Sequence, residues 1–194
     1  MKPTWFWFAL TLCACQSTAQ TPAPAPTPSV QRVAEIAIAN QDYKGAIEAL
    51  TSAIVEEPSN AYLYYLRGLA YYSGYKQAYD AEPTSADAQD ISRAITDFTK
   101  ALELDPNNGE AYNYRGVAYS TLNDHEHALA DYNAAIKLQP GEATPYYGRA
   151  YLYEQTGQKE LAVADYQRFL ELSHDDFWRG EAEKRLKALQ EQPR

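Results

Sequence analysis

The sequence contains one short cluster of metal-ligating residue types, His125-Glu126-His127. Imidazole and carboxylate groups bind zinc and similar ions, but residues two apart do not share one face of a helix. No cysteine follows Cys15 to complete a ligand set. We therefore expect the two histidines to begin an exposed helix, with no metal bound.

Motifs of known catalytic chemistry are missing from the sequence: there is no nucleophile elbow, Gly-rich phosphate loop or zinc-protease motif. The Asp and Glu residues are isolated, as is typical of solvated helix faces. The sequence therefore predicts a protein that is not an enzyme and has no cofactor. A metal-binding or hydrolytic protein is a remote alternative, for which activity lost in a His125/His127 double variant would be needed.

The charge balance is acidic, with a formal net charge of −9 and a pI near 4.8. Proteins that bind nucleic acid usually offer a basic stripe that replaces phosphate counterions. This composition predicts a soluble body that does not bind nucleic acid.

Apolar residues recur at helical spacing in two halves of the segment Gly109–Glu142, and Asn123-Asp124 separates the halves. Two amphipathic helices cannot cover each other's apolar faces alone, so such a unit must stack on copies of itself. The apolar positions are Ala111, Tyr112, Gly116, Val117 and Tyr119 in the first half, and Ala128, Leu129, Tyr132, Ala135, Ile136 and Leu138 in the second.

This segment resembles the tetratricopeptide repeat (TPR) family, whose 34-residue pattern is matched by Tyr112, Gly116, Tyr119, Ala128, Tyr132, Ala135 and Pro140. The resemblance implies an all-α solenoid of helix-turn-helix repeats. Copies of the pattern place four repeats at residues 27–60, 61–108, 109–142 and 143–176, followed by a capping helix and tail at 177–194. In the cap, Phe177–Gln190 has Trp178, Ala182, Leu186 and Leu189 on one face.

Two repeats depart from the pattern. The first is weakened, as expected of a terminal copy, with helices predicted at Val30–Asn40 and Tyr43–Glu56. The second carries about 14 extra residues within Ser73–Ser92, which predicts a loop or paired helix extensions. Thr84 or Ser85 is the expected N-cap of the helix that follows. The insertion is either surface variation or an element specific for a partner.

An Arg and an Asp occur together in repeats two to four and are replaced together in repeat one by Val33 and Ala49. Because both members change together, we predict a contact between them, within a repeat or between neighbours. The alternative is that each is independently exposed to solvent. The pairs are Arg67 with Asp97, Arg115 with Asp131, and Arg149 with Asp165.

The TPR resemblance implies that the first helix of each repeat lines a concave groove, where tyrosines would form a platform for a protein or peptide. We expect about half of these tyrosines to serve as core instead. The pattern by which chaperone-binding TPR proteins hold a C-terminal carboxylate is not matched, since Gln31 and Glu35 stand at the corresponding places. The predicted groove residues are Tyr62, Tyr65, Leu69, Tyr72, Asn113, Tyr114, Val117, Tyr147 and Tyr151.

The amino terminus indicates an export signal, because Lys2 precedes an apolar run, Trp5–Leu12, that is too short to span a bilayer. The sequence Leu12-Cys13-Ala14-Cys15 resembles the lipobox of bacterial lipoproteins. This implies a signal peptide at 1–14 and acylation of Cys15. Residues 15–28 would then be a Pro-rich tether. The alternative is ordinary cleavage after Ala19, which would release a soluble periplasmic or secreted binding module.

Taken together, the sequence predicts a membrane-anchored TPR adaptor that binds a partner protein in the bacterial cell envelope. It resembles the outer-membrane TPR lipoproteins that serve peptidoglycan hydrolases or help assemble secretin and pilus machinery. In a cell with two membranes, Gln16 after the lipidated Cys, rather than Asp, resembles the signal for the outer membrane.

Overall fold

The computed structural model of the protein describes residues 29–84 and 86–191. The predicted signal peptide, Cys15, the Pro-rich tether and Ser85 lie outside these residues. Over the described ranges the chain forms nine α-helices and no strands, so the predicted all-α class is confirmed. No helix there is long and apolar enough to cross a membrane.

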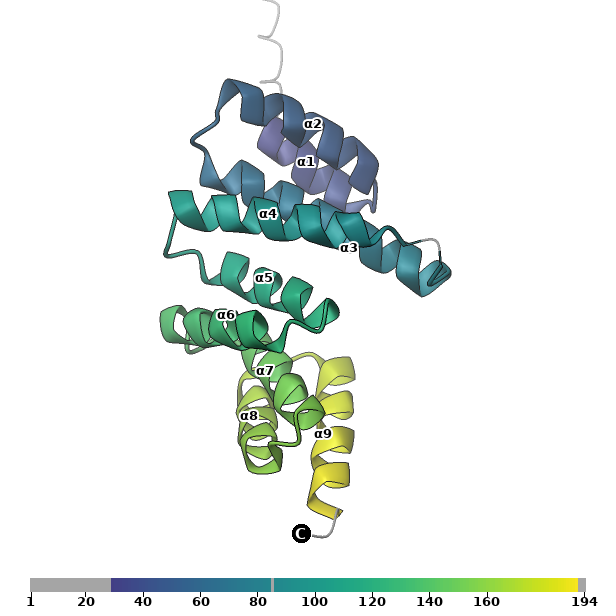
Figure 1. Ribbon diagram of the computed structural model, residues 1–194, viewed down its shortest axis with the longest axis vertical. Coiled ribbons are helices and arrows are strands. Elements are labelled where there is room, and N and C mark those ends of the chain that lie inside the picture. The colour runs from purple at the N-terminus through teal and green to yellow at the C-terminus, as the bar shows by residue number, and fades with distance from the viewer. Residues whose placement is uncertain (1–28, 85, 192–194) are drawn as a thin grey trace, which may run out of the picture.

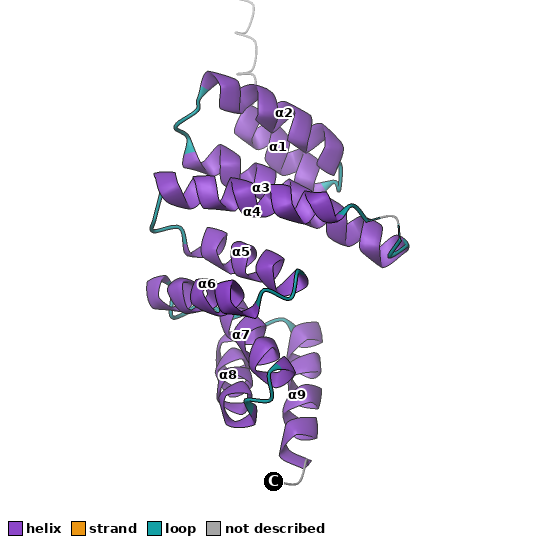
Figure 2. Ribbon diagram, in the orientation of Figure 1, coloured by secondary structure: helices purple, strands orange, loops and turns teal. Residues whose placement is uncertain are grey.

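The first eight helices form four successive pairs, and the ninth packs on the last pair (Figure 1). Each helix contacts mainly its neighbours in sequence, and short loops join them (Figure 2). This is the stacked arrangement that repeated helix pairs require. The helices are α1 Val30–Ala39, α2 Tyr43–Glu56, α3 Ala61–Ala81, α4 Ala88–Leu104, α5 Gly109–Thr121, α6 His125–Leu138, α7 Thr144–Gln155, α8 Lys159–Leu172 and α9 Asp176–Glu191.

The turn within a pair uses the same backbone geometry in three of the four pairs. Gln41, Asn123 and Gly157 have positive φ values of 62°, 59° and 73°, and each directly precedes the N-cap of the second helix. In two of these turns the N-cap is an Asp whose side chain accepts a hydrogen bond from a backbone N–H, at Gly45 and at His127. The turn chemistry therefore fixes where the second helix begins.

The core of each pair is built from a buried Ala and a large residue one turn later on the second helix. These are Ala46 with Leu50, Ala94 with Phe98, Ala128 with Tyr132, and Ala162 with Tyr166, none more than 2% exposed. The facing position on the first helix must be small. A Cβ added at Gly116 would lie 3.1 Å from the Tyr132 ring, and one at Gly68 would lie 2.9 Å from the Phe98 ring.

The insertion in the second repeat takes the form of paired helix extensions. α3 has 21 residues against 13 in α5, and α4 has 17 against 14 in α6. Together with a longer connection, these differences account for the extra residues. The predicted N-cap was wrong: Asp87, rather than Thr84 or Ser85, caps α4 by accepting from the Gln89 backbone N–H. Asp87 directly precedes the helix, so its carboxylate reaches the free N–H groups of the first turn.

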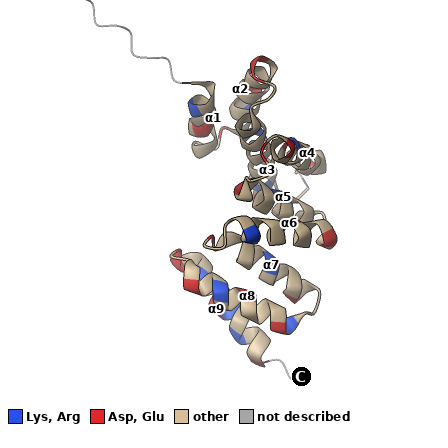
Figure 3. Cartoon of the chain, turned by 90° about the vertical axis from the view of Figure 1, so that its left-hand side faces the viewer, with Lys and Arg blue, Asp and Glu red and all other residues tan. Residues whose placement is uncertain are grey.

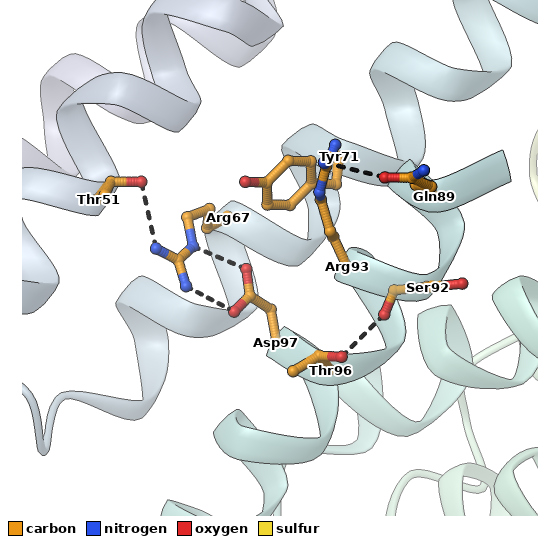
Figure 4. A pocket seen from close by; sticks show the side chains of 8 residues that line it. All are labelled: Thr51, Arg67, Tyr71, Gln89, Ser92, Arg93, Thr96 and Asp97. Carbon is orange, nitrogen blue, oxygen red and sulfur yellow. Dashed lines mark hydrogen bonds and ion pairs between the residues drawn. The ribbon is translucent and has the colours of Figure 1, made fainter. Parts of the chain in front are cut away.

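The predicted Arg–Asp contacts are confirmed, and they lie within a repeat. Each arginine donates two hydrogen bonds of 2.7–2.8 Å from Nε and Nη2 to one carboxylate. The aspartates are 4–6% exposed, so the alternative of independent solvent exposure is excluded. The third nitrogen, Nη1, bonds a polar side chain on the preceding pair, namely Thr51, Thr99 or Asn133 (Figure 4 shows the first of these).

The last helix, α9, agrees with the predicted cap to within one residue at each end. Ala182 and Leu189 are buried on its inner face. Arg185 ties the helix to α7 by pairing with Glu154 at 3.2 Å. Arg179 donates to the Ser173 carbonyl oxygen at 2.8 Å. These contacts hold α9 against α7 and α8.

Candidate binding groove

A concave site with a volume of about 640 Å³ lies between the extended end of α3 and the start of α9. We call it the main groove. Its walls are mostly apolar, and its charged side chains, Lys76 and Asp175, come from its two ends. It is lined by Tyr72, Lys76, Val117, Ser120, Thr121, Tyr132, Ala143, Thr144, Tyr147, Gly148, Tyr151, Phe169, Ser173, Asp175 and Trp178.

An aromatic cluster forms the α9 end of the main groove. The Tyr147 ring contacts Phe169 and Trp178 edge to face, with centroid distances of 5.1 and 5.2 Å. Trp178 is 45% exposed and Tyr151 is 37% exposed, so both offer ring surface to a ligand. Rings that are held by neighbouring rings lose little side-chain conformational freedom when a ligand binds. They are therefore suited to anchor the ligand.

A smaller, polar site of about 160 Å³ lies beside the main groove, and Thr144 lines both. We call it the polar pocket. It collects hydrogen-bond acceptors from the start of α5 and from the loop before α7. Its lining residues are Tyr65, Gly109, Glu110, Asn113, Tyr114, Gln139, Glu142, Thr144 and Pro145.

Of the nine predicted groove residues, seven line one of these two sites. Tyr72, Val117, Tyr147 and Tyr151 line the main groove, and Tyr65, Asn113 and Tyr114 line the polar pocket. Two residues line neither. Tyr62 is 40% exposed and donates to Glu35 Oε1 at 3.0 Å, while Leu69 packs against the core.

Sequence reasoning missed several lining residues. The amphipathic pattern predicts only that Trp178 lies on the inner face of the cap. Lys76 lies in the insertion, whose role the sequence leaves undecided. Phe169 stands where the repeat pattern has a small residue, and that departure was the available signal. Glu110 and Glu142 carry no signal, because isolated acidic residues look like solvated surface.

Burial raises the pKa of several tyrosines that line the two sites. The pKa of Tyr65 is raised by burial and by Glu110, to which its hydroxyl donates at 2.9 Å. Burial is also the main cause of the raised pKa of Tyr114, Tyr72 and Tyr147. These hydroxyls therefore stay protonated at neutral pH and can donate hydrogen bonds.

The histidine cluster sits at the start of α6, away from both sites. His127 Nδ1 lies 2.8 Å from Asp124 Oδ2, and its ring stacks on Tyr119 at 5.0 Å. Over the described ranges no group of three or more His, Cys, Asp or Glu side chains is arranged to hold a metal ion.

A third cavity, of about 480 Å³, opens between α2, α3 and α4 (Figure 4). Its two arginines are already engaged: Arg67 binds Asp97 and Thr51, and Arg93 pairs with Asp90 at 2.6 Å. This cavity therefore offers no surplus of positive charge to a ligand.

Figure 3 shows Lys and Arg interspersed with Asp and Glu along the solenoid rather than joined in one continuous stripe.

Two family models described as tetratricopeptide repeat match the chain, one over residues 34–83 and 84–143 and the other over 115–187. The chain belongs to the TPR family. The matched residues run from within α1 to within α9. A search of curated proteins finds no match.

Solved structures of TPR proteins share this fold. The thermophilic TPR protein TTC0263 of Thermus thermophilus is 21% identical, with a TM-score of 0.65 and coverage of 82% of this chain and 79% of that one. MamA of Desulfovibrio magneticus RS-1 is 20% identical, with a TM-score of 0.65 over 82% and 81%. The first TPR domain of Spaghetti (RPAP3), solved with the HSP90 peptide SRMEEVD, is 27% identical, with a TM-score of 0.56 over 68% and 90%.

Proposed function

We propose that this TPR protein is an adaptor that binds a segment of a partner protein in its main groove and does no chemistry. The observation that carries the proposal is the groove itself: about 640 Å³ of mostly apolar surface with half-exposed aromatic rings at one end. Interfaces use aromatic anchors in this way. The peptide bound by the TPR domain of Spaghetti (RPAP3) is consistent with such use of the fold.

The partner differs from a chaperone C-terminus. Gln31 and Glu35 stand where a carboxylate-binding TPR would offer Lys and Asn, and Glu35 accepts a hydrogen bond from Tyr62. A carboxylate in this position would be repelled by Glu35. The insertion contributes Lys76 to the groove, next to Tyr72 of the repeat itself in the lining, which favours the view that the insertion is specific for a partner.

A crosslinking pull-down from envelope membranes tests the proposal. Tyr151→Ala and Trp178→Ala should each lower recovery of the partner about tenfold, because anchor residues contribute on the order of 1.4 kcal/mol or more. Leu161→Ala is the matched control, since Leu161 is 47% exposed on α8 and lines no described groove. Equal recovery with all three variants would refute the groove.

We also propose that the protein is held at a membrane of the bacterial envelope by acylation of Cys15, on the strength of the lipobox Leu12-Cys13-Ala14-Cys15. Two signals are needed for stable anchoring, and a lipoprotein carries several chains. Intact-mass analysis should show a mature protein that begins at Cys15 with acyl chains attached, and a Cys15→Ser variant should lose them. A mature start at Gln20 without acyl chains would establish the soluble alternative.

A further inference from the structure

The polar pocket contains an acceptor that has no donor. Asn113 is only 7% exposed, and its Oδ1 atom is buried without a hydrogen-bond partner. A buried carbonyl oxygen without a partner is costly, so folded proteins rarely retain one without a reason. Because Asn113 lines the polar pocket, we expect a turn of its side chain to bring this oxygen to a ligand donor.

Two other side chains of the pocket, Glu110 and Glu142, accept hydrogen bonds and cannot donate them when ionised. Glu110 receives the Tyr65 hydroxyl on Oε2, and Glu142 is exposed at the rim. Neither glutamate forms an ion pair with any described residue. Among the described residues that line the pocket, none is basic. The pocket therefore carries two uncompensated negative charges around a buried acceptor.

The walls of the pocket suit a cation as well. Burial and the charge of Glu110 both raise the pKa of Tyr114, which places its ring in the negative potential of that carboxylate. An anionic group would meet Glu110 and Glu142 with no positive charge to offset them.

We propose that the polar pocket binds a Lys or Arg side chain of the partner, whose neighbouring apolar residue occupies the main groove. This inference rests on the proposed function. Because Thr144 lines both sites, one short segment can reach both. A volume of about 160 Å³ accommodates one side-chain head but not a folded element. The partner segment thus pairs a basic residue with a large apolar one, which complements the −9 net charge of the chain.

Two pools of labelled nine-residue peptides, acetylated and amidated, test this proposal against the purified full-length chain. Both pools carry Trp at the centre. The first has Lys or Arg at one flanking position, and the second has norleucine or citrulline there. Fluorescence anisotropy at low salt should show at least tenfold tighter binding of the basic pool, and added salt should reduce that difference.

Charge removal identifies the pocket. The double variant Glu110→Gln/Glu142→Gln should lose the preference for the basic pool while keeping its affinity for the neutral pool. The matched control is Glu126→Gln/Glu160→Gln, which removes two first-turn glutamates from α6 and α8 and should keep the preference. Trp178→Ala should weaken binding of both pools.

The outcomes separate the inference from the proposed function. If the unmodified chain binds both pools equally and Trp178→Ala weakens that binding, the proposed cation pocket is overturned. The proposed binding in the main groove is then still supported. Loss of preference in the Glu126/Glu160 control also overturns it, because the effect would then come from net charge alone. Failure of both pools to bind contradicts both claims.

Asn113→Leu separates binding from folding. It replaces an amide whose buried oxygen has no partner with an apolar side chain of similar size. The variant should therefore unfold at the same or a higher temperature while losing the preference for the basic pool. A lower melting temperature together with an unchanged preference would show that Asn113 has a structural role only.

Discussion

Each of the three arginines that pair with a buried aspartate donates hydrogen bonds to two neighbouring helix pairs. In the case of Arg115, two nitrogens bind Asp131 of its own pair and the third binds Thr99 of the preceding pair at 3.1 Å. The fixed fork of a guanidinium suits this arrangement, which a lysine could not reproduce. Arg67, Arg115 and Arg149 therefore couple neighbouring repeats as well as the helices within a repeat.

Removing Asp131 should be costly. Asp131→Ala leaves the Arg115 charge in a largely buried site, and the loss of one partner from a buried pair costs roughly 3–5 kcal/mol. Chemical denaturation measures the change in the free energy of unfolding. Asp90→Ala, which breaks the exposed pair with Arg93, should cost no more than about 1 kcal/mol. Similar losses of unfolding free energy in Asp131→Ala and Asp90→Ala would contradict the expected difference between the buried and the exposed pair.

These residue-level contacts could be predicted, because the arginine and the aspartate disappear together from the first repeat. Asn113 could not be assigned in the same way, since the sequence indicates which helix it occupies but not that its oxygen is buried without a partner. Tyr65 shows the same difficulty: its pattern is that of a groove residue, yet it is 5% exposed and serves mainly as core.

At the scale of elements, the approach of α6 to α7 depends on a glycine. A Cβ added at Gly148 would lie 2.6 Å from the buried ring of Tyr132, so α7 can pass this close only without a side chain there. Gly180 on α9 is the opposite case, because nothing lies within 4 Å of the position of its Cβ.

The two glycines should respond oppositely to the same substitution. Gly148→Ala should lower the free energy of unfolding by about 1–3 kcal/mol, because a packed core resists an added methyl group. Gly180→Ala should raise it by roughly 0.5–1 kcal/mol through helix propensity. Thermal unfolding of both variants measures these changes. A gain in stability in Gly148→Ala would contradict the close approach of α7 to the Tyr132 ring.

The order and type of the elements followed from periodicity, and the insertion was located from the repeat length. Its form as paired helix extensions was one of two predicted outcomes. The role of α9 in the groove was missed, because an amphipathic pattern identifies the apolar face but not how Trp178 at its edge meets α7. That contact depends on the orientation that Arg179 and Arg185 impose on the helix.

Over the whole molecule, buried tyrosines make stability depend on pH in the alkaline range. Burial raises the pKa of Tyr65, Tyr132 and Tyr166 above the ordinary value of 10.0, so the folded state favours the neutral phenol. Since the pKa is higher in the folded state, this contribution is complete below about pH 10 and is lost as the pH rises further.

We therefore expect the denaturation midpoint to be steady from about pH 8 to about pH 9.5 and to fall steeply above about pH 10. A Tyr166→Phe variant should show a shallower fall, although it loses the hydrogen bond to Glu154 at 2.7 Å. Phenolate absorbance should rise together with unfolding for the buried rings. A midpoint that stays constant to about pH 11 would contradict this account.

The central claim is that a partner lies in the main groove, and site-specific photo-crosslinking in cells tests it most directly. A benzoylphenylalanine placed at Tyr151, on the groove wall, is compared with one placed at Leu161, which is comparably exposed on α8. The account predicts a discrete adduct with one partner protein from position 151 and none from position 161. An adduct of equal yield from both positions, or from position 161 alone, would contradict it.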